Sequence, residues 1–355
     1  MNNFLSKIFS MLLVATLASV TLFITSCEGP AGKDGLAGTD GKDGQEQCAT
    51  CHNSSNLLFA KQLQWENSQH GKGTSFERSA ATCAPCHTND GFLEVVSSGE
   101  FNTKAEIMNP TGQNCRTCHH VHRKSDQTDW ELTYTGDVKF RMSNTTHNFG
   151  KGSVCAMCHQ TRALSPMIDI TKTDSTYRVG SSHFGPHYSS AANAFVGNGA
   201  FEIPGPEPYN KTVVHMNVLQ NSCVDCHMGK AYGAQAGGHT MKMKYDNGTT
   251  LVDNISVCKG CHTDANVTNF DFYGTQTETR NLLTQLREIL VTKKMIDTTS
   301  SHGHWEHDAA VPGSYPTLHA AALYNYRWAA ADQSWGIHNP KYIKAVIKNA
   351  INALQ

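Results

Sequence analysis

The chain carries little charge and no long run of one sign. Asp, Glu, Lys and Arg make up 17% of its 355 residues, and the formal net charge is −1. Proteins that bind nucleic acids usually present a strongly basic face or segment. The composition therefore argues against a nucleic-acid partner.

Long apolar segments are missing after residue 25. The one long uncharged run, IFSMLLVATLASVTLFI, follows Lys7 and has the character of a membrane helix or of the apolar core of an export signal. It leads into ITSC, which resembles a bacterial lipoprotein box ending at Cys27. We expect a signal peptide over residues 1–26 and an exported chain, lipid-anchored through Cys27 to a membrane and facing the periplasm or the cell surface. The alternative is an uncleaved N-terminal helix with an incidental cysteine.

A glycine-rich segment follows Cys27. Six triplets beginning with glycine run from Gly29 to Gln45–Glu46, with Pro30 as their single proline. A collagen triple helix needs glycine at every third position but also more proline. We interpret residues 27–47 as a lipidated cysteine with an extended tether, reaching roughly 55 Å if its conformation is like polyproline. A triple helix is the alternative.

Cysteine is abundant and regularly spaced. Twelve of the thirteen cysteines form six C-x-x-C pairs, and a histidine follows every pair. Structural zinc or a redox disulfide does not require that histidine, whereas c-type haem attachment does. We therefore predict six covalently bound haems, held by Cys48, Cys51 and His52; Cys83, Cys86 and His87; Cys115, Cys118 and His119; Cys155, Cys158 and His159; Cys223, Cys226 and His227; and Cys258, Cys261 and His262.

Six haems leave too few residues for a separate domain around each one. The sequence thus predicts one hexahaem domain over residues 48–355, mainly α with extensive irregular loops, organised around packed haems. Residues 263–355 form its helical part. Helical spacing of apolar residues is clear in RNLLTQLREILVTKKMI and TLHAAALYNYRWAAAD, and Asn339–Pro340 is a predicted helix start.

Thirteen further histidines are available as second axial ligands. A second histidine or a methionine closes haem iron for electron transfer, whereas an open position admits a substrate. His147 and His215 each lie eight residues before a motif, and glycines precede His239. The candidates are His70, His122, His147, His187, His215, His239 and His338. Met241, Met243 and His183 compete with them, and SHGHWEH is either a polar loop or a site for a stray metal.

The order of these motifs over residues 65–355 is similar to that of the ammonia-forming cytochrome c nitrite reductases and their hydroxylamine oxidoreductase relatives. The resemblance implies four pairings of a distal histidine with a haem. They are His70 with the haem at Cys155, His215 with that at Cys258, His239 with that at Cys115, and His338 with that at Cys223. It leaves His122, His147 and His187 for the haems at Cys48 and Cys83.

Two departures separate the chain from those enzymes. The nitrite reductases usually carry C-x-x-C-K at the catalytic haem, and this chain has CAPCH there. The family's calcium ligands are also missing after Cys158, where the sequence reads CHQTRAL. We therefore predict six bis-histidine irons and an electron carrier between a membrane donor and an extracytoplasmic redox partner protein. The alternatives are a reductase or oxidase of a nitrogen or sulfur oxyanion with one open haem, and a subunit of a cytochrome filament; the sequence leaves oligomerisation open.

Replacing the predicted lipid site tests the anchor. Cys27→Ser should move haem-loaded protein from the membrane to the soluble fraction, because the thioether-linked lipid is lost. Fractionation followed by haem staining measures this. Unchanged membrane retention of the variant would contradict lipidation at Cys27.

Overall fold

The computed structural model describes residues 51–52, 57–73, 75–212, 214–299 and 308–355. The predicted signal peptide, Cys27, the tether and Cys48 lie outside these residues, as do the histidines of the segment SHGHWEH. All described residues belong to one unit, 47–355. Within it, no helix is both long and apolar enough to cross a membrane.

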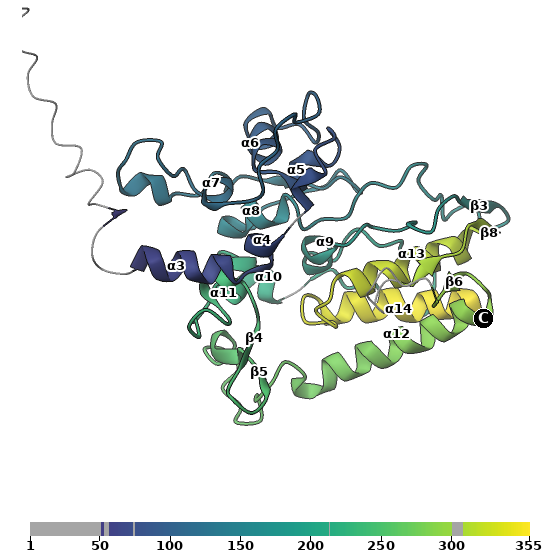
Figure 1. The fold of residues 1–355 in the computed structure, drawn as a ribbon. Coiled ribbons are helices and arrows are strands. Elements are labelled where there is room, and N and C mark those ends of the chain that lie inside the picture. The colour runs from purple at the N-terminus through teal and green to yellow at the C-terminus, as the bar shows by residue number, and fades with distance from the viewer. Residues whose placement is uncertain (1–50, 53–56, 74, 213, 300–307) are drawn as a thin grey trace, which may run out of the picture. The chain divides into compact units, whose positions relative to one another are not determined.

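Short helices and turns make up the first two thirds of the described chain, and three long helices the last third (Figure 1). The α-helices are α3 (Leu57–Glu66), α4 (Gln69–Lys72), α5 (Ala84–His87), α6 (Asn89–Ser98), α7 (Cys115–Cys118), α8 (Ser153–Ala156), α9 (Ala191–Phe195), α10 (Val214–Val218), α11 (Cys223–His227), α12 (Thr275–Thr292), α13 (Thr317–Ala331) and α14 (Pro340–Leu354). The 3₁₀ turns are η1 (Ser75–Glu77), η2 (Gln127–Trp130), η3 (Gly150–Gly152), η4 (Gly238–Thr240), η5 (Ile255–Val257) and η6 (Phe272–Gly274).

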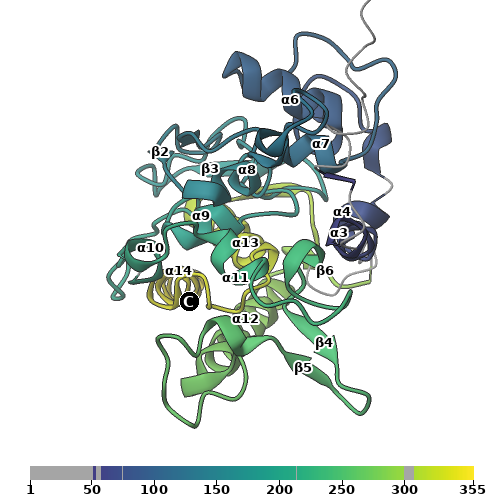
Figure 2. The ribbon, with the colours of Figure 1, turned by 90° about the vertical axis from the view of Figure 1, so that its left-hand side faces the viewer.

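The strands are short and pair only in twos within the described ranges. They are β1 (Val138–Lys139), β2 (Thr146–His147), β3 (Thr176–Val179), β4 (Lys244–Asp246), β5 (Leu251–Asp253), β6 (Ile296–Asp297), β7 (Ala309–Ala310) and β8 (Gly313–Pro316). The antiparallel pairs are β1–β2, β3–β8, β4–β5 and β6–β7, and Figure 2 shows β4 and β5 as a projecting hairpin. The expected mainly helical and irregular fold is thus confirmed.

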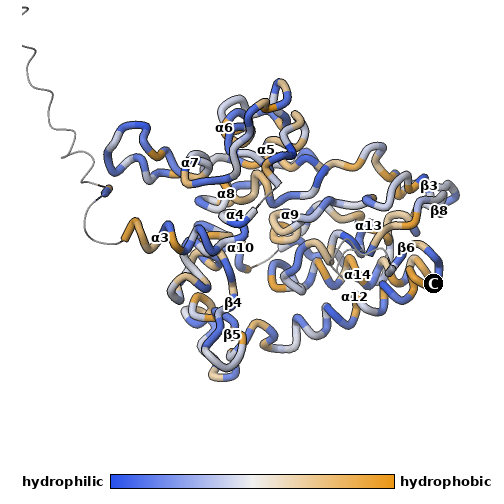
Figure 3. Tube along the Cα trace, in the orientation of Figure 1, coloured by the Kyte–Doolittle hydropathy of each residue, from blue (hydrophilic) through white to orange (hydrophobic). Residues whose placement is uncertain are grey.

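The main apolar core lies among the three long helices. α13 packs along α14, and both contact α12 (Figures 1 and 2). α12 alternates hydrophilic and hydrophobic residues (Figure 3) and buries Leu283, Leu286 and Leu290. The helical spacing of apolar residues understates the burial of α13, because nearly the whole helix is buried, including Tyr324 and Trp328. α13 is therefore the central helix of this core.

Buried asparagines attach a loop to this helical core. Asn325 of α13 accepts a hydrogen bond from the Phe201 N–H at 2.8 Å and donates to the Phe201 carbonyl at 2.7 Å. Asn349 of α14 makes the same two bonds with Glu207, at 3.0 and 2.8 Å. Gly205 leaves the room for this, since a Cβ there would lie 2.3 Å from the Asn349 Oδ1. The side chains thus replace a strand partner for residues 201–207.

The start of α14 follows the sequence prediction. The Asn339 side chain accepts a hydrogen bond from the Tyr342 N–H at 3.2 Å, and Pro340 occupies the first turn. Asparagine at this position satisfies a backbone N–H that the helix itself leaves without a partner. The residue just before this cap, His338, is consequently held at a fixed point.

Apolar core is sparse around the C-x-x-C-H motifs. The two buried apolar clusters draw on residues 138–203 and 283–354 and include no residue of 57–130 or 205–270. Four of the motifs lie in these two poor ranges. A folded segment with so little apolar burial needs another source of stability, and a covalently attached macrocycle is one such source.

Removing the Asn349 clamp should destabilise the protein. Asn349→Ala leaves the part-buried N–H and carbonyl of Glu207 without their side-chain partner, so the free energy of unfolding should fall by about 1–3 kcal/mol. The matched control is Asn352→Ala, an exposed position on the same helix, where the change should stay within about 0.5 kcal/mol. Denaturant unfolding of the haem-loaded protein measures both. Equal losses in the two variants would contradict the clamp.

Candidate functional site

The five C-x-x-C-H motifs that lie wholly within the described residues each fold into one helical turn. The histidine N–H donates to the carbonyl of the first cysteine in four motifs, at distances of 2.8–3.2 Å: Cys83 to His87, Cys115 to His119, Cys155 to His159 and Cys258 to His262. In a fifth, Cys223–His227 is itself the helix α11. Residues three and four apart share one face of a helix. The turn thus presents both thiols and the imidazole in one direction.

Every motif histidine faces a second histidine from a distant part of the chain. The ring centres of the six pairs lie between 6.0 and 6.4 Å apart. With the motif histidine first, the pairs are His52 and His122, His87 and His187, His119 and His239, His159 and His70, His227 and His338, and His262 and His215. Four of these are the pairs that the resemblance implies.

This spacing fits one iron atom between the two rings. A metal–imidazole bond is about 2 Å long and the nitrogen lies about 1.1 Å from its ring centre, so two opposed ligands have ring centres about 6 Å apart. Stacked or directly hydrogen-bonded rings would be closer. The paired histidines therefore fit c-type haems, whose iron the motif histidine and the second histidine would hold between them.

Hydrogen bonds on the other ring nitrogen orient several of these histidines. Nδ1 of His119 lies 2.7 Å from the Trp130 carbonyl, and Nδ1 of His227 lies 3.0 Å from the Met241 carbonyl. Nδ1 of His87 lies 2.9 Å from the Ser75 hydroxyl. A metal-binding imidazole typically engages its second nitrogen in this way, which fixes both tautomer and orientation. Nε2 is then the nitrogen left to face the partner ring.

Burial keeps most of the paired histidines neutral. It lowers the pKa of His159 to about 4, aided by His70, His227 and His338 nearby. Burial likewise lowers the pKa of His187 and of His239 to about 4. Neutral imidazole is the form that binds a metal, so these side chains are ready ligands at neutral pH.

His338 differs from the others. Burial acts to lower its pKa, but the adjacent Asp332 carboxylate outweighs burial and the pKa is raised. Nδ1 of His338 lies 2.6 Å from Oδ1 of Asp332. Sequence reasoning missed Asp332. Its contact with a histidine six positions later exists only because the chain turns back after α13.

The loop around η4 serves three pairs at once. It supplies His239, and Met241 touches two further pairs through its carbonyl on His227 and its sulfur, 3.2 Å from Nδ1 of His70. Gly237 and Gly238 have φ of +65° and +50°. A Cβ on Gly237 would lie 2.1 Å from the Lys230 carbonyl. These glycines therefore allow the loop to close against its own chain.

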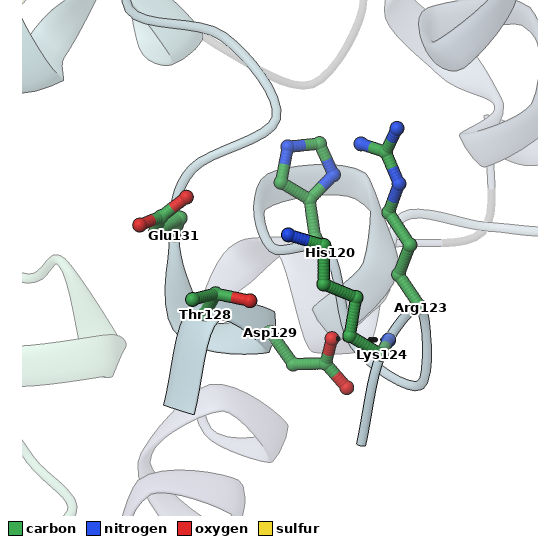
Figure 4. Close-up of a pocket in the computed structure, with 6 residues that line it drawn as sticks. All are labelled: His120, Arg123, Lys124, Thr128, Asp129 and Glu131. Carbon is green, nitrogen blue, oxygen red and sulfur yellow. Dashed lines mark hydrogen bonds between the residues drawn. The ribbon is translucent and has the colours of Figure 1, made fainter. Parts of the chain in front are cut away.

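A carboxylate shapes the loop that carries His122. Asp129 accepts hydrogen bonds from the N–H groups of Lys124 and Ser125 at 2.8 and 3.0 Å. His122 adopts a left-handed φ of +62° in this turn. Figure 4 shows Asp129 pointing at the Lys124 backbone while His120 and Arg123 extend away from it, lining a small polar pocket. The turn therefore points His120 and His122 in different directions, and His122 faces His52.

His147 is placed apart from the six pairs. It lies in β2, its Nε2 is 3.0 Å from the Thr145 hydroxyl, and its ring centre is 5.1 Å from that of Phe140. His215, at the same offset before its motif, lies in α10. The shared eight-residue offset is therefore not a repeated structural unit, because a hairpin holds one histidine and a helix the other. We do not propose His147 as a ligand.

Neighbouring motifs approach one another through their cysteines. Cys86 is close enough to Cys158, and Cys223 to Cys155, to raise the pKa of the Cys158 and Cys155 thiols, together with burial. The pKa of Cys155 is raised chiefly by Cys223 and by burial, and Cys118 is close enough to raise it further. The pKa of Cys226 is raised chiefly by burial, and Cys258 is close enough to raise it further. The motif at Cys155 thus adjoins three others, and the motif at Cys223 continues the series to Cys258.

Comparison with known proteins identifies the class. A family described as outer membrane cytochrome MtrC/MtrF-like, domains II/IV, matches residues 27–131, and the family cytochrome c552 matches residues 200–355. The chain is a multihaem c-type cytochrome. No curated protein matches it in sequence. A solved structure, that of the outer cell wall cytochrome OcwA, has a TM-score of 0.49 and 20% identity over 83% of this chain; the chain spans 50% of that protein's length.

The close packing of the η4 loop against the Lys230 carbonyl should be necessary for the pairing of His239 with His119. Gly237→Ala places a Cβ against the Lys230 carbonyl, so His239 should withdraw and one haem should become high-spin in the absorption spectrum. Gly233→Ala is the matched control, since Gly233 also has a left-handed φ, of +54°, but a Cβ there meets no atom within 4 Å. Retention of full low-spin character in Gly237→Ala, or its loss in both variants, would contradict this role.

Proposed function

We propose that this cytochrome is a hexahaem electron carrier, lipid-anchored through Cys27, that passes electrons between a membrane donor and an extracytoplasmic redox partner protein. The observation that carries the proposal is the set of six histidine pairs at iron-spanning distance. When bound, each haem supplies one-electron exchange between ferric and ferrous iron. The pairing of every motif histidine favours this exchange over binding of a substrate.

In this proposal the twelve motif cysteines hold the haems as thioethers, and six histidines complete the axial positions. The distal ligands are His70, His122, His187, His215, His239 and His338. Hydrogen bonds to Nδ1 keep several rings aimed at the iron. Paired imidazoles exclude water and small ligands from both faces.

The contacts between motifs support a continuous route through the protein. Cysteines of adjoining motifs lie near one another at Cys86 with Cys158 and at Cys155 with Cys223. His122 lies three residues beyond His119 in the chain and faces His52, which adds the first site to the third. Protein segments that bring attachment points this close leave no room for an insulating domain between them.

A location outside the cytoplasm is part of the proposal. The matched family named for outer membrane cytochromes begins at Cys27, the predicted lipid site. Covalent haem attachment of this type normally takes place outside the cytoplasm, and the glycine triplets would act as a tether between the anchor and the first haem. The proposal includes association with redox partner proteins, and it is compatible with association between copies of the chain.

The competing function, a reductase with one open haem, centres on Cys83. There His187 faces His87 at 6.1 Å between ring centres, and burial and Arg162 favour its neutral, ligating form. A histidine in this position closes the iron. The geometry therefore favours the carrier over an enzyme of nitrogen or sulfur oxyanions.

Carbon monoxide distinguishes the two functions. The ferrous protein should bind none at neutral pH, because all six irons carry two histidines, and its resting spectrum should be entirely low-spin. His338→Ala is the positive control and should create one site that binds carbon monoxide and is high-spin. One high-spin, ligand-binding haem in the unmodified protein would overturn the carrier proposal, and an unaltered spin state in His338→Ala would remove that ligand.

A further inference from the structure

A buried carboxylate lies against one of the paired histidines. The Asp332 side chain is 1% exposed, and its Oδ1 is 2.6 Å from Nδ1 of His338. Its other oxygen accepts a hydrogen bond from the Ser334 hydroxyl, which in turn accepts the His338 N–H at 3.2 Å. Asp332 and Ser334 thereby hold both the ring and the backbone of His338.

The other Nδ1 partners in the described ranges are uncharged. They are the carbonyls of Trp130 and Met241, the hydroxyls of Ser75 and Ser189, and the thioether of Met241. Asp332 forms no ion pair with a lysine or arginine among the residues that the structure describes. Its negative charge is therefore directed at the imidazole of His338 and not shared with a cationic side chain.

We propose that Asp332 is a positioning residue that lowers the reduction potential of the haem held by Cys223, Cys226, His227 and His338. This inference rests on the proposed function, in which His227 and His338 are the axial ligands of one iron. It adds a specific low-potential position within the series of haems.

Two physical effects act in the same direction. A carboxylate that accepts a hydrogen bond from the Nδ1–H makes the opposite nitrogen, Nε2, a stronger electron donor to the metal. The ferric state carries one more positive charge than the ferrous state, so a nearby buried negative charge favours the ferric state, and little water is present to screen it. Reduction adds one electron to the iron and neither forms nor breaks a bond, so no further reactant is required.

The position of this site gives the effect a consequence. The motif at Cys223 lies between the motifs at Cys155 and Cys258. A haem that resists reduction there passes an arriving electron on quickly to either neighbour. It also remains oxidised when its neighbours are reduced, which keeps the middle of the route open to the next electron.

Asp332→Asn in the full haem-loaded chain tests the inference. Asparagine keeps the size of the side chain and removes its charge. In a redox titration followed by absorption, the reduction potential of one haem of the six should rise. At a fixed potential, the ferrous-to-ferric ratio of that haem should increase at least tenfold, which corresponds to about 59 mV for one electron. The low-spin g-values of one ferric haem should change in the same variant, as expected for a weaker axial donor.

Asp308→Asn is the control. Asp308 is an equally buried carboxylate just before β7, but it binds Arg287 of α12 and Tyr326 of α13, and its hydrogen bonds and ion pairs among the described residues involve none of the paired histidines. Its variant should leave all six potentials within error of the unmodified protein, even if stability falls. An equal upward shift in both variants would overturn the specific role of Asp332.

The remaining outcomes are also decisive. An unmoved potential in Asp332→Asn with all haems low-spin would overturn the inference while leaving the proposed function intact. If Asp332→Asn makes one haem high-spin, Asp332→Glu should restore the low-spin state and the potential, and failure to restore them would overturn the inference. Failure of the proposed function is seen separately, as fewer than six low-spin haems in the unmodified protein.

Discussion

In four of the motifs, a hydrogen bond from the histidine N–H to the carbonyl of the first cysteine underlies the rest of the architecture. It closes a single helical turn, and that turn aims two thiols and an imidazole at the same point in space. A turn of four or five residues has little stability of its own. In each pair, a second histidine supplied from a distant segment faces the motif histidine. The fold can therefore be described as the set of connections that brings those histidines into place.

The helical core and the motif-bearing segments divide the work. α12, α13 and α14 contain most of the main apolar core, and asparagines on α13 and α14 hold Phe201 and Glu207 through backbone-like hydrogen bonds. The end of α13 and the start of α14 also fix Asp332 and His338. The stable part of the protein thus terminates at a functional site, whereas the other sites depend on short turns and loops.

Local patterns in the sequence were sufficient for some of this and insufficient for the rest. The attachment motifs, the helix cap at Asn339 and the periodicity of α12 follow from residues close together in the chain. The facing of His122 with His52 depends on a left-handed turn held by Asp129, and the facing of His187 with His87 depends on tertiary packing. An offset shared by His147 and His215 suggested a common unit, yet one residue lies in a strand and the other in a helix. Spacing identifies an attachment site, but the identity of its partner is a property of the folded chain.

The order of the paired histidines along the chain bears on how the protein is made. Synthesis proceeds from the N-terminus, so His70 exists before His159, and His215 before His262. The other four motif histidines precede their partners, and His227 must wait for His338 close to the C-terminus. A haem attached early at Cys223 would have one exposed axial face until α13 and α14 had formed. The haem at Cys223 would thus gain its second histidine only once the turn between α13 and α14 has placed His338 against His227.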